Sequence, residues 1–142
     1  MESWITKKDL SNSQISQSSV GWQIAHSLKV ANNIIKLLAK SNPDDYQWTF
    51  NLIRTLCLQF RYFPRGKAKA PRAVDPKIEE ISTESLNELF FKVRTRLDSV
   101  TNIHPNSFFD HAYFGKIKRD DAFLFMLVHT KHHLKIIKDI AG

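Results

Sequence analysis

Residues 20–41 read VGWQIAHSLKVANNIIKLLAKS, and the spacing of their apolar side chains decides the fold class. The polar stretch SNSQISQSS before them is rich in residues that cap helix N-termini, and Pro43 after them cannot continue a helix. Between these limits apolar residues recur every three or four positions, as one buried face of an α-helix requires. They are Val20, Ile24, Leu28, Ala31, Ile35 and Leu38. We therefore predict a long amphipathic helix that packs against a core.

Three further segments show helical periodicity, and none shows a convincing strand alternation. Residues 46–63 carry an apolar stripe at Phe50, Ile53, Cys57 and Phe60, widened by Leu52 and Leu56. A third helix opens at the capping signal STES and carries Leu86, Leu89, Phe90, Val93, Leu97 and Val100. The last helix starts near Arg119 and carries Ala122, Met126, His129, His133, Ile136 and Ile140. Four such helices predict an all-α protein, a four-helix bundle.

The second and third helices are separated by PRGKAKAPRAVDPKIEE, residues 64–80, which has prolines at positions 64, 71 and 76. We predict a long connection without regular structure. Helices joined by so long a connection need not be antiparallel neighbours. The segment NIHPNSFFDHAYFGKI, residues 102–117, interrupts the helical pattern before the last helix.

Length and composition predict one soluble globular domain over residues 1–142. No apolar run is long enough to cross a bilayer, and the first residues lack the apolar segment of a secretory signal. The single cysteine excludes an internal disulfide, which favours a cytoplasmic location. A net charge of +7 attracts acidic partners and permits nucleic-acid binding without indicating it.

The stretch HTKHHLKII, residues 129–137, contains three of the six histidines. His129 and His133 are four residues apart, so both project from one face of the last helix, within its apolar stripe. A histidine placed there gives up water and needs partners for two ring nitrogens. A metal ion is one solution, and a buried hydrogen-bonded cluster without metal is another. His132 lies beside the stripe, and we expect it to face solvent or a neighbouring group rather than act as a ligand.

A third candidate ligand, His26, lies in the first helix at the flank of its main apolar face. If the first and last helices are neighbours, three imidazoles converge inside the bundle. Three neutral ligands with an open fourth position are typical of a catalytic zinc ion, whereas structural zinc usually has four protein ligands. An ion held in this way lowers the pKa of bound water to about 7 or binds a thiolate.

GWQIAHSLKVANN near the start and HTKHHLKII near the end resemble the DinB-like superfamily, which includes the bacillithiol-type thiol transferases. PRGKAKAP and HAYFG are similar in particular to an uncharacterised domain-of-unknown-function branch, although Ala112 stands where proline is expected. The resemblance covers about residues 18–140 and implies an up-down-down-up bundle. It also implies a divalent metal, zinc or nickel, held by one histidine of the first core helix and two of the last. By motif these are His26, His129 and His133.

The segment RYFPRGKAKAPRAVDPK, residues 61–77, carries six basic residues and one aspartate. Its simplest interpretation is a solvated loop surface. In the functional alternative, Arg65 and Lys67 reach over the mouth of the bundle and hold an anionic substrate.

The segment FFDHAYFGK just before the last helix contains His111 and Tyr113, our candidates for catalytic groups. Its simpler interpretation is an aromatic plug at one end of the core. His111 is alternatively a partner of a ligand, a proton shuttle, or a fourth ligand that would make the site structural. Cys57 lies on a helical apolar face, where we expect a buried small side chain and not a nucleophile.

Our first hypothesis is a metal-dependent enzyme, a hydrolase or, as the resemblance suggests, a thiol transferase. It would act on a small anionic substrate or a low-molecular-weight thiol. The alternative is a non-enzymatic binding module that uses its basic loop on an acidic ligand or nucleic acid. Nucleic acid is disfavoured, because the basic residues are not interleaved with an aromatic stripe. No membrane partner is expected. A homodimer is compatible with a bundle of this kind, but no residue identifies an interface.

Overall fold

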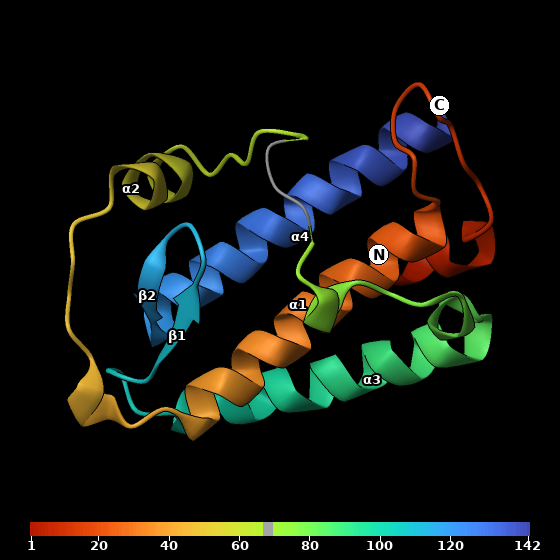
Figure 1. Ribbon diagram of the computed structural model, residues 1–142. Helices are drawn as coiled ribbons and strands as arrows, with labels where there is room; N and C mark the ends of the chain where they lie inside the picture. The colour runs from red at the N-terminus through yellow and green to blue at the C-terminus, as the bar shows by residue number, and fades with distance from the viewer. Residues whose placement is uncertain (67–69) are drawn as a thin grey trace.

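The computed structural model describes residues 1–66 and 70–142, most of which are helical (Figure 1). The long first helix, α1 (Val20–Lys40), begins as predicted, because the hydroxyl of Ser19 accepts a hydrogen bond from the backbone N–H of Trp22. Its predicted stripe is buried, with Ile24 and Leu38 fully inaccessible to solvent. Helix α1 packs against both α3 (Thr83–Ser99) and α4 (Arg119–Ala141), so it forms the centre of the structure.

Helices α1 and α3 run in the same direction. A Cβ atom at Gly21 would collide with Ile81, just before α3, and Asn32, farther along α1, accepts a hydrogen bond from Arg96 in α3. Helix α4 runs antiparallel to α1, since Gln23 contacts His133 while the later Ser27 contacts the earlier Thr130. An up-down-down-up order makes the first and last helices parallel, so that topology is not confirmed.

The second helix is much shorter than predicted. Helix α2 spans Leu52–Gln59, and the face that it buries carries Arg54 and Leu58. The predicted stripe of Phe50, Ile53 and Phe60 is exposed instead. The orientation follows from Arg54, whose guanidinium donates hydrogen bonds to the carbonyl oxygens of Thr49, Phe114 and Lys116.

The expectation that the chain has no strands was wrong. Strands β1 (Phe108–His111) and β2 (Gly115–Lys118) form an antiparallel hairpin just before α4. Phe109 pairs with Ile117, and both side chains are buried. Gly115 has a φ of +67°, which glycine adopts readily in the turn. Each strand has four residues, too few for an alternation to stand out in the sequence.

The connection between α2 and α3 is long, as predicted, but it contains regular structure. Two short 3₁₀ helices, η3 (Arg72–Val74) and η4 (Ile78–Ile81), lie along α1. Further 3₁₀ turns are η1 (Glu2–Lys7), η2 (Pro43–Asp45) and η5 (Val100–Asn102). Ile5 of η1 is buried in the core, so the core extends toward the N-terminus beyond residue 18. Among the described helices, none combines the length and the apolar character needed to cross a bilayer.

Replacing Arg54 with methionine should lower the free energy of unfolding by roughly 2 to 4 kcal/mol, because three carbonyl groups lose a charged donor. Urea unfolding followed by circular dichroism measures the change. Arg94→Met on the exposed surface of α3 is the matched control and should change stability little. Equal effects of the two substitutions would contradict a structural role of Arg54.

Candidate metal centre

The packing of α1 on α4 brings together His26, His129 and His133. Each offers one ring nitrogen to a group in which all such atoms lie within 4.8 Å of one another. The ring centroids of His129 and His133 are 4.5 Å apart, and that of His26 lies 5.2 Å and 4.8 Å from them. His26 and His133 are buried, whereas His129 is partly exposed. These three histidines could bind a metal ion.

Hydrogen bonds determine which nitrogen of two rings is free. Nδ1 of His26 donates to the carbonyl oxygen of Val74 at 2.8 Å, which leaves the lone pair on Nε2. Nδ1 of His133 donates to Oε1 of Gln23 at 2.6 Å, which again leaves the lone pair on Nε2. Nε2 of His133 lies 3.3 Å from Nε2 of His129. The Nε2 lone pairs of His26 and His133 are therefore available within the group, and the ring of His129 lies beside them.

The amide of Gln23 is oriented by a second contact. Its Nε2 donates to the hydroxyl of Ser16 at 3.1 Å, so its oxygen faces His133. Metal-binding histidines commonly donate their other N–H to an acceptor of this kind, which fixes the ring orientation. Gln23 and the carbonyl of Val74 occupy that position for His133 and His26.

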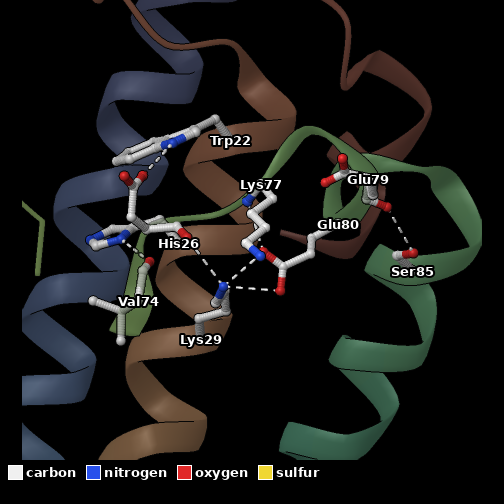
Figure 2. Close-up of polar contacts among 9 residues, drawn as sticks. Trp22, His26, Lys29, Val74, Lys77, Glu79, Glu80 and Ser85 are labelled. Atoms are coloured by element: carbon white, nitrogen blue, oxygen red, sulfur yellow. Dashed lines mark hydrogen bonds and ion pairs between the residues drawn. The ribbon is translucent and has the colours of Figure 1, made fainter. Parts of the chain in front are cut away.

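Hydrogen bonds hold the segment that carries η3 and η4 against α1 beside His26 (Figure 2). Nε1 of Trp22 donates to the carboxylate of Asp75 at 3.2 Å, while the Trp22 ring stacks on His26 at a centroid distance of 4.8 Å. Lys29 pairs with Glu80 at 2.8 Å and also donates to the carbonyl of Asp75. These contacts hold the backbone of Val74 against His26.

Burial keeps the three rings neutral. The pKa of His129 is lowered to about 3, mainly by desolvation and next by the proximity of His26. Desolvation is also the main cause that lowers the pKa of His133, followed by the proximity of His129. For His26, desolvation lowers the pKa against the opposing effect of the hydrogen bond to Val74. Neutral imidazole is the form that binds metal ions.

Aromatic rings line the group on the side of α4. The ring of Phe125 stacks on His129 at 5.8 Å, and Phe63 lies 6.3 Å from His129 by ring centroids. Phe63 also lies 6.4 Å from His132, which remains outside the three-histidine group. The pKa of His132 is lowered by burial and then by the charge of Arg65.

The catalytic candidates do not join the group. The ring of His111 stacks on that of Phe114 at 4.6 Å and lies 5.1 Å from that of Phe125, which in turn stacks on His129. Its Nδ1 accepts a hydrogen bond from the backbone N–H of Tyr113, whose side chain is exposed. With Phe114 buried, the segment resembles the predicted aromatic plug more than part of a four-ligand site.

The basic loop is only partly described. Arg65 forms an ion pair with Asp139 of α4. Its guanidinium is therefore engaged by a carboxylate of the same chain, in the place that a substrate anion was predicted to take. Lys67 lies outside the described residues. Cys57 is half-buried rather than buried, and desolvation raises the pKa of its thiol, which favours the protonated form.

Two surface cavities lie away from the three histidines. One, of about 450 Å³, is lined by residues at the ends of α1 and α3, including Ile35, Ser99 and His104. The other, of about 400 Å³, lies between α2 and α4 and is lined by Arg54, Arg61 and other residues. Neither is lined by a histidine of the group.

Sequence reasoning missed the groups that orient the rings. Gln23 lies three residues before His26 and faces a histidine 110 residues away, while Val74 contributes only its backbone. A backbone acceptor leaves no signature in a sequence. Gln23 gave one weak signal in the sequence, because it is a polar residue directly beside Ile24 of the apolar stripe. The structure buries its side chain, which therefore needs hydrogen-bond partners.

The metal-free protein should lose stability as the pH falls from 6.5 toward 3. Unfolded His129 binds a proton below about pH 6.5, but the folded ring stays neutral to about pH 3, so the unfolded state binds more protons in this window. Each such histidine contributes a slope of about 1.4 kcal/mol per pH unit well below 6.5. Urea unfolding with a chelator should show a smaller slope in His129→Gln and an unchanged slope in the exposed control His104→Gln. An unchanged slope in His129→Gln would contradict its depressed pKa.

Comparisons of the chain with known protein families, with characterised proteins and with solved structures find no match. What the chain does therefore has to be inferred from its own residues.

Proposed function

We propose that His26, His129 and His133 bind a divalent metal ion, zinc or nickel, and that the protein is a DinB-like metal-dependent thiol transferase or hydrolase. The observation that carries the proposal is the convergence of three neutral imidazoles from two helices within 4.8 Å. A metal-free hydrogen-bonded cluster accounts for less of the geometry. It satisfies both ring nitrogens of His133, but Nδ1 of His129 and Nε2 of His26 make no hydrogen bond to any described residue.

The surroundings of the rings also support a metal site. Val74 and Gln23 accept hydrogen bonds from Nδ1 of His26 and His133. Both rings are therefore already in the tautomer whose Nε2 has a free lone pair for a metal ion. The low pKa of His129 removes proton competition at neutral pH. Phe63 and Phe125 give the site an apolar wall, which limits access of water and strengthens electrostatic interactions.

The chemistry would come from the coordination position that three protein ligands leave open. A bound ion with three neutral ligands supplies a Lewis acid that activates water for hydrolysis or binds a thiol as the thiolate. The chain's own contribution is to orient the rings and to keep them unprotonated. We expect a substrate to approach the site on the side of His129, because His129 is partly exposed whereas His26 and His133 are buried.

The scaffold is proposed to be a variant of the DinB-like bundle. Helices α1, α3 and α4 supply three long helices, and the short α2 together with the β1–β2 hairpin takes the place of a long fourth one. The two ligand-bearing helices, α1 and α4, are adjacent, as the resemblance requires.

Elemental analysis of the untagged protein should find close to one divalent ion per chain after incubation with zinc or nickel. His26→Ala, His129→Ala and His133→Ala should each lose it, because three ligands become two. His132→Ala is the matched control on the same helix and should retain it. Absence of metal from the wild-type protein would leave the buried hydrogen-bonded cluster as the explanation of the histidines.

The metal-loaded protein should then accelerate either the transfer of a low-molecular-weight thiol to an electrophile or the hydrolysis of ester and amide substrates. The same assays on His129→Ala provide the background rate. A protein that binds metal but shows neither activity would contradict the enzymatic part of the proposal and leave the metal site intact.

Replacing Gln23 with leucine should weaken metal binding about 10- to 100-fold, because Nδ1 of His133 loses its acceptor and the ring loses its orientation. Competition titration with a coloured chelator measures the affinity. Gln17→Leu removes an amide that contacts only the backbone of Ser13, and it should leave the affinity unchanged. Equal affinities of wild type and Gln23→Leu would show that the amide does not support the ligand.

A further inference from the structure

Helix α2 presents its apolar face to solvent. Leu52, Ile53, Leu56 and Phe60 fall within one side of the helix and are 46–71% exposed, while Arg54 and Leu58 face the protein. Trp48 and Phe50, just before the helix, are also about two-thirds exposed. Trp48 lines the cavity between α2 and α4, on the other side of the helix. We refer to the other five exposed side chains as the α2 surface: Phe50, Leu52, Ile53, Leu56 and Phe60.

The α2 surface is almost free of charge. Residues 46–60 contain one charged side chain, Arg54, and its guanidinium is turned inward onto backbone carbonyls. The chain as a whole carries +7. Two copies therefore repel each other least where their α2 surfaces meet.

No described element of the same chain covers the α2 surface. Helix α2 packs on α4 through its opposite side, and α3 lies on the far side of α1 (Figure 1). Monomeric proteins rarely leave a contiguous apolar area of several hundred Å² in contact with water.

We propose that the α2 surface is the contact through which two copies of this chain form a dimer. Five large apolar side chains exposed to this extent present on the order of 600 Å², about three quarters of the roughly 800 Å² that each partner of a standard interface buries. A two-fold axis through α2 sets the same apolar face against itself, so no second complementary surface is required. The aromatic members Phe50 and Phe60 are of a residue type enriched in interfaces.

A dimer contact fits these residues better than a membrane surface does. Segments that bind anionic lipid carry clusters of lysine and arginine beside their apolar residues. Of the described residues that follow the α2 surface, Arg61 stands next to it, and the nearby Arg65 is paired with Asp139. Among these described residues, no cluster of lysine and arginine borders the apolar area.

Sedimentation velocity of the full chain over about 1 to 100 µM tests the proposal. The wild-type protein should dimerise, and Phe60→Lys should weaken the dimer at least about tenfold, because it places a positive charge opposite its own copy. A lysine at the C-terminal end of α2 suits the helix dipole, so the monomer should keep its circular dichroism spectrum. Leu56→Lys, in the middle of the same face, should have the same effect.

Phe91→Lys is the matched control, because Phe91 is the same residue type with the same exposure, 71%, but lies on α3. It should leave the dimer unchanged. A wild-type protein that stays monomeric throughout the range would overturn the proposal, as would equal weakening by Phe91→Lys. A monomer that sediments with phosphatidylserine vesicles and loses this property in Phe60→Lys would assign the surface to a membrane instead.

Discussion

The antiparallel contact between α1 and α4 is the constraint on which the rest of the structure depends. It sets Gln23 against His133 and Ser27 against Thr130, and in doing so places His26 beside both histidines of α4. A shift of either helix by one residue would rotate a histidine out of the group, since successive residues on a helix differ by about 100°. The remaining elements support this contact: α3 covers the other side of α1, and the hairpin and α2 lie against α4.

The long connection between α2 and α3 is part of the same arrangement. Its backbone accepts from His26 at Val74 and from Lys29 at Asp75, and its side chains bond Trp22 and Lys29. The backbone carbonyls and carboxylates of the segment thereby form hydrogen bonds with side chains of α1 instead of with water. The candidate metal centre is built from the two helices and from a segment for which no regular structure was predicted.

The predictable features were those with a repeating or local signal. The apolar period of residues 20–41, the cap at Ser82 and the acidic start of α4 located three helices, and the spacing of His129 and His133 identified two members of the group. His26 was reached by assuming that the first and last helices are neighbours, which the structure bears out.

The features that sequence reasoning missed depend on distant partners. The apolar period of residues 46–63 indicates an inward face only if something covers it, but Arg54 turns α2 the other way by bonding carbonyls about 60 residues later. The pairing of β1 with β2 is local, but the two strands are too short to give a recognisable alternation of their own. The relative directions of the helices follow from contacts between residues far apart in the sequence. The apolar periodicity of a single helix carries no information about such contacts.

The position of the three histidines has a consequence for the entropy of the chain. Residues 26 and 129 are about 100 positions apart in the sequence, so an ion held by all three histidines would close a loop of about 100 residues. Such a cross-link would restrict the denatured chain over this loop, and it is lost if the ligands separate. Occupation of the site would therefore act as a reversible cross-link between α1 and α4, coupling the supply of metal to the fraction of molecules that are folded.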